Sequence, residues 1–173
     1  MPAKLRKSTA KGPRTTPSSK NDIASQYAIL QARYSLPMFA EIDTLFDVAS
    51  VEAETKRPLK EVAKRVFEEM DLFRKTLENL MQPDNSILSM QEAEALTEAQ
   101  HEIVVRLARA MMRLDRRLLR AEAANTDEEY ADFIRQAAAE WPPIRKELSL
   151  VALALEQSWS RNKKSKPSQH YLG

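Results

Sequence analysis

The sequence predicts an all-α protein: a bundle of five or six helices, mostly antiparallel, with disordered basic tails at its N- and C-terminal ends. Three observations support this fold class. Apolar residues recur at steps of three and four, the period of one helix face. The 173 residues include only two Gly, which disfavours the tight turns of β-hairpins. Short segments containing Pro or Asn separate the periodic stretches, as expected of connections between helices.

Charge divides the chain into three parts. Residues 1–20 carry six cations and residues 161–173 carry four, and neither segment contains an acid. Residues 21–160 hold the other 17 cations and all 25 acids, a net charge of −8. Both ends are poor in large apolar residues, so they cannot bury enough surface to offset the entropy of ordering. We therefore expect one helical bundle domain over 21–160, between a disordered tail over 1–20 and another over 161–173.

Two helices are expected in the first third of the domain. The first covers about 21–34, because Ile23, Tyr27 and Leu30 share one face. The second begins at Pro37, since the first turn of a helix tolerates Pro. Its polar face is acidic, and no cation occurs between residues 37 and 54.

The third helix begins at Pro58, and its apolar residues repeat in a near-heptad pattern as far as Leu80. Residues 83–85, Pro-Asp-Asn, then interrupt the pattern. Ser89 followed by Glu92 matches a capping box, in which the two side chains cap the first turn reciprocally. The sequence therefore predicts a fourth and longest helix from Ser89 to about Ala124.

Thr126 with Glu129 matches a second capping box and predicts a short fifth helix. Pro142 and Pro143 end that helix and begin the last one, in which residues 148–155 are apolar on nearly every side. Such a helix is central in a bundle or lies in an interface between subunits. At eight residues the run is too short to span a bilayer, and no other run approaches the ~20 residues required. The candidate partner interface comprises Leu148, Val151, Leu155 and Trp159.

The densest functional signal is an arginine stripe on the predicted fourth helix. Its six members fall within an arc of roughly 100° at about 100° per residue. Guanidinium groups bind carboxylates and phosphates with paired hydrogen bonds. The stripe therefore fits pairing with acids of the bundle, a face for nucleic acid or an acidic protein, or contacts between subunits. It consists of Arg106, Arg109, Arg113, Arg116, Arg117 and Arg120.

The ten tail cations are the second signal. On disordered ends they could neutralise several phosphates, which gives salt-sensitive affinity without sequence preference. Alternatively the tails only aid solubility or are removed by processing. Tyr171 is the only tail aromatic, so contacts to the nucleic-acid backbone are favoured over base stacking. The cations are Lys4, Arg6, Lys7, Lys11, Arg14, Lys20, Arg161, Lys163, Lys164 and Lys166.

The residue inventory disfavours catalysis and cofactor binding. Without Cys there is no disulfide, thiolate zinc site or Cys nucleophile, a composition that fits a reducing, cytoplasmic compartment. Glu98 and His101 form one Glu-x-x-His pair, whereas di-iron bundles use two, and the only other His is His170. No phosphate loop is present and no spacing joins a nucleophile to a base. We expect no metal, no cofactor and no catalytic residues.

Two functional hypotheses follow from these patterns. The first is a non-enzymatic helical protein that binds a polyanion, most directly the backbone of DNA or RNA, through its tails and the arginine stripe. The second is a protein–protein adaptor, chaperone or structural subunit that uses the acidic bundle and the apolar last helix. Either form could be a homo-oligomer.

Overall fold

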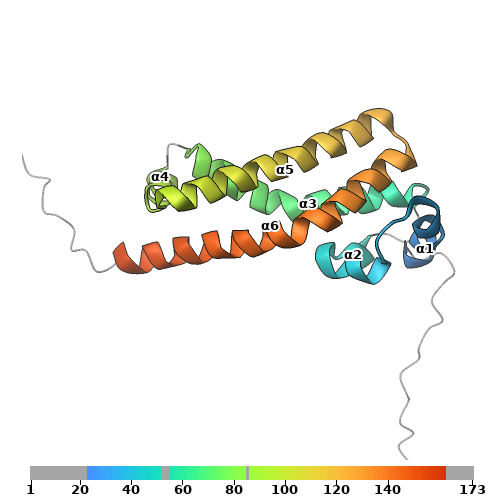
Figure 1. The fold of residues 1–173 in the computed structure, drawn as a ribbon, viewed down its shortest axis with the longest axis horizontal. Helices are drawn as coiled ribbons and strands as arrows, with labels where there is room; N and C mark the ends of the chain where they lie inside the picture. The colour runs from blue at the N-terminus through green and yellow to red at the C-terminus, as the bar shows by residue number, and fades with distance from the viewer. Residues whose placement is uncertain (1–22, 52–54, 85, 163–173) are drawn as a thin grey trace, which may run out of the picture.

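The computed structural model describes residues 23–51, 55–84 and 86–162, with the side chains of 161 and 162 left out. Within these residues it is an all-α bundle without strands. Three long helices form its body: α3 (Pro58–Met81), α5 (Glu98–Ala124) and α6 (Asp127–Asn162). In Figure 1, α5 runs antiparallel to both α3 and α6, which run in the same direction. The predictions about the tails over 1–20 and 161–173 concern residues outside this description, apart from the backbone of the last helical residues.

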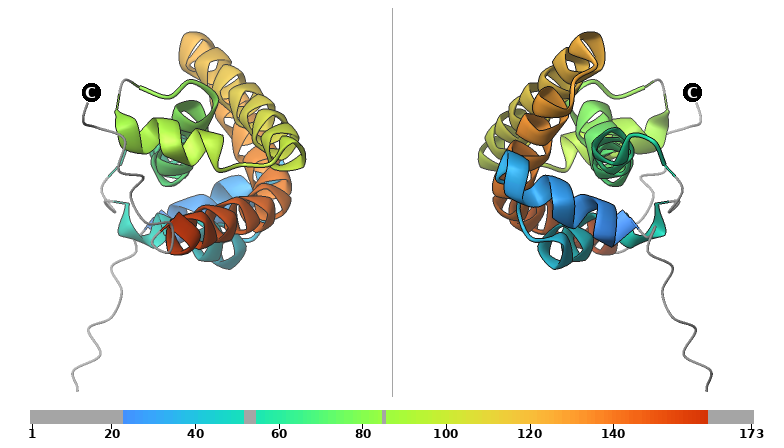
Figure 2. Two further views of the ribbon diagram at one scale, coloured as in Figure 1. Left: turned by 90° about the vertical axis from the view of Figure 1, so that its left-hand side faces the viewer. Right: turned by 90° about the vertical axis from the view of Figure 1, so that its right-hand side faces the viewer.

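Three short helices cover the ends of this body. α1 (Ile23–Tyr34) and α2 (Phe39–Phe46) pack where α3 and α6 begin, and α4 (Ile87–Glu94) lies at the opposite end beside α3 (Figures 1 and 2). A single 3-10 turn, η1 (Val48–Ser50), follows α2. The described residues form six α-helices, within the predicted five or six, and none of these helices is long and apolar enough to cross a membrane.

Of the two prolines predicted to begin helices, Pro58 does so and Pro37 does not. Pro58 occupies the first turn of α3, as predicted. Pro37 lies outside α2, which begins two residues later after an extended Met38. The carbonyl of Pro37 instead accepts a hydrogen bond from the buried Tyr27 hydroxyl at 3.1 Å. This bond ties the connection before α2 to α1.

The prediction of one helix from Ser89 to Ala124 was wrong, because the chain breaks between α4 and α5. α4 is capped by Ser86, whose hydroxyl accepts from the Ser89 amide at 3.1 Å. The capping box lies at Thr97 and Gln100: Thr97 Oγ1 accepts from the Gln100 amide at 3.3 Å, and Gln100 Oε1 accepts from the Thr97 amide at 2.8 Å. Those reciprocal bonds satisfy amides that would otherwise lack partners, and they start a new helix there.

Residues 127–162 form one helix rather than the two predicted, so Pro142 and Pro143 lie inside α6. Thr126 still marks its start, since its hydroxyl accepts from the Glu129 amide at 3.5 Å. Internal prolines remove backbone donors and clash with the preceding turn, which bends a helix without necessarily ending it. Figure 1 shows α6 changing direction part-way along its length.

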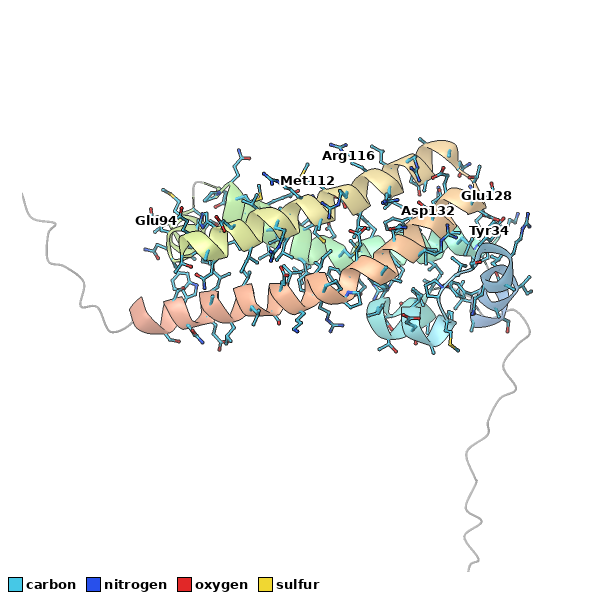
Figure 3. All side chains as sticks on the ribbon, viewed as in Figure 1. Tyr34, Glu94, Met112, Arg116, Glu128 and Asp132 are labelled. Carbon is cyan, nitrogen blue, oxygen red and sulfur yellow. The ribbon has the colours of Figure 1, made fainter. Side chains whose placement is uncertain are left out.

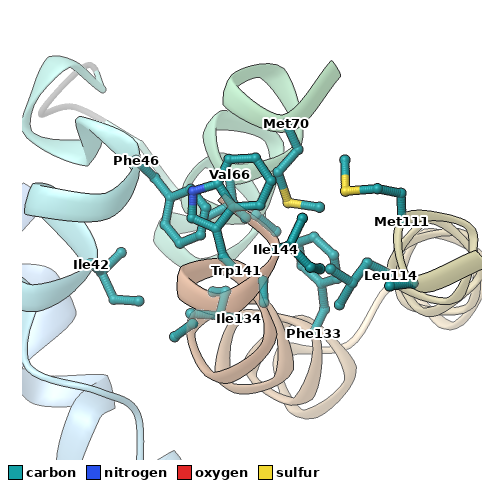
Figure 4. Close-up of a cluster of buried hydrophobic side chains, with 14 of the residues drawn as sticks. Ile42, Phe46, Val66, Met70, Met111, Leu114, Phe133, Ile134, Trp141 and Ile144 are labelled. Atoms are coloured by element: carbon teal, nitrogen blue, oxygen red, sulfur yellow. The ribbon is translucent and has the colours of Figure 1, made fainter. Parts of the chain in front are cut away.

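The core is centred on Trp141, which lies immediately before the two prolines and is 2% exposed. Its ring lies 6.0 Å from that of Phe46 on α2 and 5.3 Å from that of Phe73 on α3. Figure 4 shows Phe46, Val66 and Met70 around it, with Leu114 of α5 beyond Ile144. Trp141 therefore packs inside the bundle and joins α2, α3 and α6.

Candidate functional site

The arginine stripe lies mainly against α6. Four of its six members form ion pairs with α6 carboxylates along the α5–α6 seam. The distances are 2.6 Å for Arg106–Glu147, 3.8 Å for Arg113–Glu140, 3.3 Å for Arg117–Asp132, and 2.7 and 3.1 Å from Arg120 to Glu129 and Asp132. Pairing within the bundle is thus realised for these four, with acids from α6 rather than from the acidic second helix.

The other two stripe residues, Arg109 and Arg116, are exposed and form no ion pair with any residue that the structure describes. In Figure 3, Arg116 lies on the side of α5 that faces away from α6. The nine tail cations from Lys4 to Lys20 and from Lys163 to Lys166 lie outside the described residues, and for Arg161 only the backbone is described. The described surface therefore offers a polyanion two uncommitted arginines of the stripe.

Glu98 and His101 are exposed in the first two turns of α5. Nowhere in 23–51, 55–84 and 86–162 do three or more His, Asp or Glu side chains come together in a way that could hold a metal. The Glu-x-x-His spacing thus stands alone on a solvated helix face.

The predicted partner interface is only partly available. Leu148 and Val151 are buried in the chain's own core, and Leu155 and Trp159 are half-buried. The indole Nε1 of Trp159 donates to Glu92 of α4 at 3.0 Å. Leu148 and Val151 are buried where α6 faces a groove beside α3, so the four predicted residues do not form one exposed surface.

A groove between α3 and the second half of α6 leaves part of an apolar surface open. It encloses about 320 Å³, and the polar residues in its lining are Thr76, Arg145 and Ser149. On the α3 side, Leu72 is 69% exposed at the groove edge, and Leu153 on the outer face of α6 is 49% exposed. The apolar lining consists of Leu72, Phe73, Leu77, Leu80, Leu148, Val151, Ala152 and Leu155.

The neighbouring part of the α3–α6 surface is covered by α2. Ile42 and Phe46 are buried there, and Phe46 contacts the Trp141 ring. Arg65 of α3 fixes the end of α2, because its guanidinium donates to the Asp47 carboxylate at 2.9 Å and to the Asp47 carbonyl at 3.2 Å. α2 is eight residues long, so it covers only the portion near the start of the two helices.

A second cavity, of about 460 Å³, lies on the other side of α3 against α5. Met81, Met111 and Met112 line it together with Arg74 and Asp115. Burial raises the pKa of the Asp115 carboxyl. The positive charge of Arg74, 3.9 Å away, lowers this pKa by a smaller amount. No spacing in the sequence indicates that α3 and α5 leave this gap.

The chain matches no protein-family model, no curated protein and no solved structure. Functional inference for this protein therefore rests on its own residues and their arrangement.

Proposed function

We propose that this protein is a non-catalytic helical adaptor that binds a helix of a partner protein in the groove between α3 and the second half of α6. The observation that carries the proposal is that this groove continues a surface on which α2 already packs, and that no described element covers the continuation. Amphipathic helices commonly bind in apolar grooves of this kind through residues spaced three and four apart. A cytoplasmic location is part of the proposal, on the ground that the chain lacks Cys.

Exposure along the groove supports a binding role. Leu72 at the groove edge remains largely accessible although neighbouring side chains are buried. A large side chain of this type gains about 1.5–3 kcal/mol on full burial, so two or three such anchors can supply much of the free energy of a specific complex. Clustered exposed apolar groups typically mark interaction surfaces.

The test is selection of helical peptides from a random library displayed on phage, using the full chain as bait. We expect enriched peptides that bind the full chain and lose at least about tenfold in affinity for the Leu72→Lys variant. Leu119→Lys is the matched control, because Leu119 is 59% exposed on α5 and does not line the groove.

Enriched peptides that bind both variants equally would place the recognition site elsewhere. Failure to enrich any peptide whose binding depends on Leu72 would contradict the adaptor proposal. Loss of self-association in Leu72→Lys, measured by sedimentation, would instead identify a second copy of the chain as the occupant.

A second candidate function is binding of a nucleic-acid backbone, favoured by ten cations on segments that contain no acid. The affinity of such segments falls steeply with salt, because each phosphate contact releases a condensed counterion. Within the described residues, Arg109 and Arg116 could add contacts.

Fluorescence anisotropy with a labelled DNA duplex and a labelled RNA tests this candidate. We expect full-length protein to bind with a steep salt dependence, and a full-length variant with all ten tail cations changed to Gln to lose that binding. Unchanged binding by the Gln variant would remove the tails from the function, and no binding at low salt would remove the nucleic acid.

A further inference from the structure

The cavity between α3 and α5 is lined by one face of each helix. α3 lines it from Arg74 to Gln82 and α5 lines it from Ala108 to Arg116, in both helices with residues three, four, seven and eight positions after the first. Such spacing keeps the lining residues of a helix on a single face. The cavity therefore runs lengthwise between the two helices. Its volume of about 460 Å³ lies within the range of small-molecule pockets, roughly 300–1,000 Å³.

The two ends of this cavity differ in polarity. α3 and α5 run antiparallel, so Arg74 lies 3.9 Å from Asp115 at one end and Met81 lies toward Ala108 at the other. The floor between these ends is apolar and includes Met111, which is 1% exposed. The distance along α5 from one end to the other is about 10 Å, at 1.5 Å per residue. The cavity is thus shaped for a small ligand with a polar head and an apolar body.

The Asp115 carboxylate has incomplete bonding at the polar end. It is half-buried, and none of the described residues donates a hydrogen bond to it. The guanidinium of Arg74 instead donates to Asp71 at 2.6 and 3.2 Å and to Glu78 at 2.6 Å. Lys75 also pairs with Asp71, so these two cations and two acids neutralise one another. A ligand that donates N–H groups to Asp115 would supply bonds that a buried carboxylate otherwise lacks.

Arg116 provides the opposite charge at the same end of the cavity. It follows Asp115 in the lining, it is exposed, and it forms no ion pair with any residue in the described part of the chain. Figure 3 shows Arg116 and Met112 on the same side of α5. A purely cationic or purely anionic ligand would leave one of the two charged groups without a partner. The polar end therefore matches a ligand that carries both charges.

We infer that this cavity binds a small zwitterion with an apolar body, the chemistry of an α-amino acid whose side chain is large and apolar. The ammonium group donates to Asp115, the carboxylate accepts from Arg116, and the side chain packs toward Met81 and Ala108. Methionine suits this lining because its flexible, polarisable side chain adapts to the shape of a ligand. The cavity and the partner groove lie on different sides of α3, so this inference does not depend on the adaptor proposal.

The methionine methyl groups allow binding to be located directly by NMR. The full chain, isotope-labelled at these methyls, is titrated with L-phenylalanine and, as a polar control, with L-serine. We expect saturable shifts of the Met81, Met111 and Met112 signals with phenylalanine but not with serine. The signal of Met38, which precedes α2 and does not line the cavity, should not move. Absence of the three shifts with phenylalanine, or equal shifts with serine, would overturn the inference.

Two analogues of phenylalanine test the two charges of the ligand separately. Hydrocinnamate lacks the ammonium group and should bind at least about tenfold more weakly, because it leaves the half-buried Asp115 without a donor. Phenethylamine lacks the carboxylate and should bind about threefold more weakly, because its missing partner, Arg116, is exposed. If either analogue bound as tightly as phenylalanine, the ligand would not be a zwitterion and the inference would be wrong.

Substitutions test the same two contacts from the side of the protein. Asp115→Asn should weaken phenylalanine binding at least about tenfold and Arg116→Gln about threefold. Arg109→Gln is the matched control, because Arg109 is also exposed on α5 and does not line the cavity. Unchanged affinity in a folded Asp115→Asn variant would contradict the inference. Leu72→Lys, which tests the partner groove, should leave phenylalanine binding unchanged, so the two proposals can fail separately.

Discussion

Arg74 interacts with three carboxylates where α3 faces α5. Its guanidinium bonds Asp71 at 2.6 Å and Glu78 at 2.6 Å, while Asp115 lies 3.9 Å away. Hydrogen bonds from Lys75 and then Arg74 lower the pKa of the Asp71 carboxyl, whereas burial raises the pKa of the Asp115 carboxyl. Two aspartates that share one cation are thus shifted in opposite directions.

Their substitutions should have opposite effects on stability. A lowered folded pKa means that the charged form of Asp71 stabilises the fold above its unfolded pKa, and that this contribution is lost as the pH falls through the folded value. A raised folded pKa means that the charged form of Asp115 opposes folding above its unfolded pKa, and that the penalty disappears as the pH falls. We expect Asp71→Asn to lower the urea midpoint at neutral pH and Asp115→Asn to leave it equal or higher.

Urea unfolding of both variants between neutral pH and about pH 3.5, just below the usual Asp value, checks this prediction. The difference in urea midpoint between Asp71→Asn and the original chain should be smaller at the acidic end of this pH range. A destabilised Asp115→Asn at neutral pH would show that Asp115 makes a stronger bond to Arg74 than its 3.9 Å separation indicates.

At the scale of elements, the break between α4 and α5 depends on one capping box. Thr97→Ala removes a hydroxyl that accepts from the Gln100 amide, and N-cap losses of this kind cost about 1 kcal/mol. Ser89→Ala should cost less, because Ser89 contributes its amide to the Ser86 cap and that amide is retained, while its hydroxyl makes only solvent-accessible hydrogen bonds to the Ser86 hydroxyl and Asp84. Thermal unfolding of the two variants compares them, and equal losses would favour the helix start at Ser89 that the sequence predicts.

Local sequence signals explain which elements could be predicted. The period of three and four predicts α1, α3 and the core positions such as Trp141, because burial against neighbours repeats with the helix. The predicted capping box at Ser89 lies eight residues before the observed one at Thr97, and the position of the helix start depends on how α4 packs on α3. The continuation of α6 through Pro142 and Pro143 depends on tertiary contacts of Trp141 that no local pattern contains.

The candidate sites show the same limit. Residue spacing correctly predicts that all six stripe arginines lie on one helix. It does not predict that α6 packs against this helix and supplies the acids that pair with four of them. No local sequence pattern predicts the groove, because it exists only where α2 is too short to cover α3 and α6 completely.

The α5–α6 seam yields a prediction about the arginine stripe. Changing Glu129, Asp132, Glu140 and Glu147 together to their amides removes the partners of four arginines. We expect nucleic-acid affinity at low salt to rise at least about tenfold, because each freed cation can contact a phosphate, while stability falls by about 1–3 kcal/mol, since exposed pairs contribute 0–1 kcal/mol each. Anisotropy and urea unfolding measure the two effects. Unchanged affinity in a folded variant would show that the stripe does not face the nucleic acid.

At the scale of the whole molecule, α1 and α2 cover one half of the α3–α6 surface and leave the other half open. The groove floor belongs to the folding core, because Leu77 is 1% exposed, whereas its edge is free, because Leu72 on the same helix is 69% exposed. We therefore expect substitution of Leu77 to affect stability and substitution of Leu72, five positions earlier, to affect binding.

Leu77→Ala should lower the free energy of unfolding by about 2–5 kcal/mol, the cost of a large cavity in a packed core. Leu72→Lys should change it by no more than about 0.5 kcal/mol, as for surface positions generally, while removing binding of the groove peptides. Urea unfolding and peptide anisotropy on the same protein samples make the comparison. Marked destabilisation by Leu72→Lys would mean that another segment of the chain already packs on this leucine, and a groove filled in that way would have no room for a partner helix.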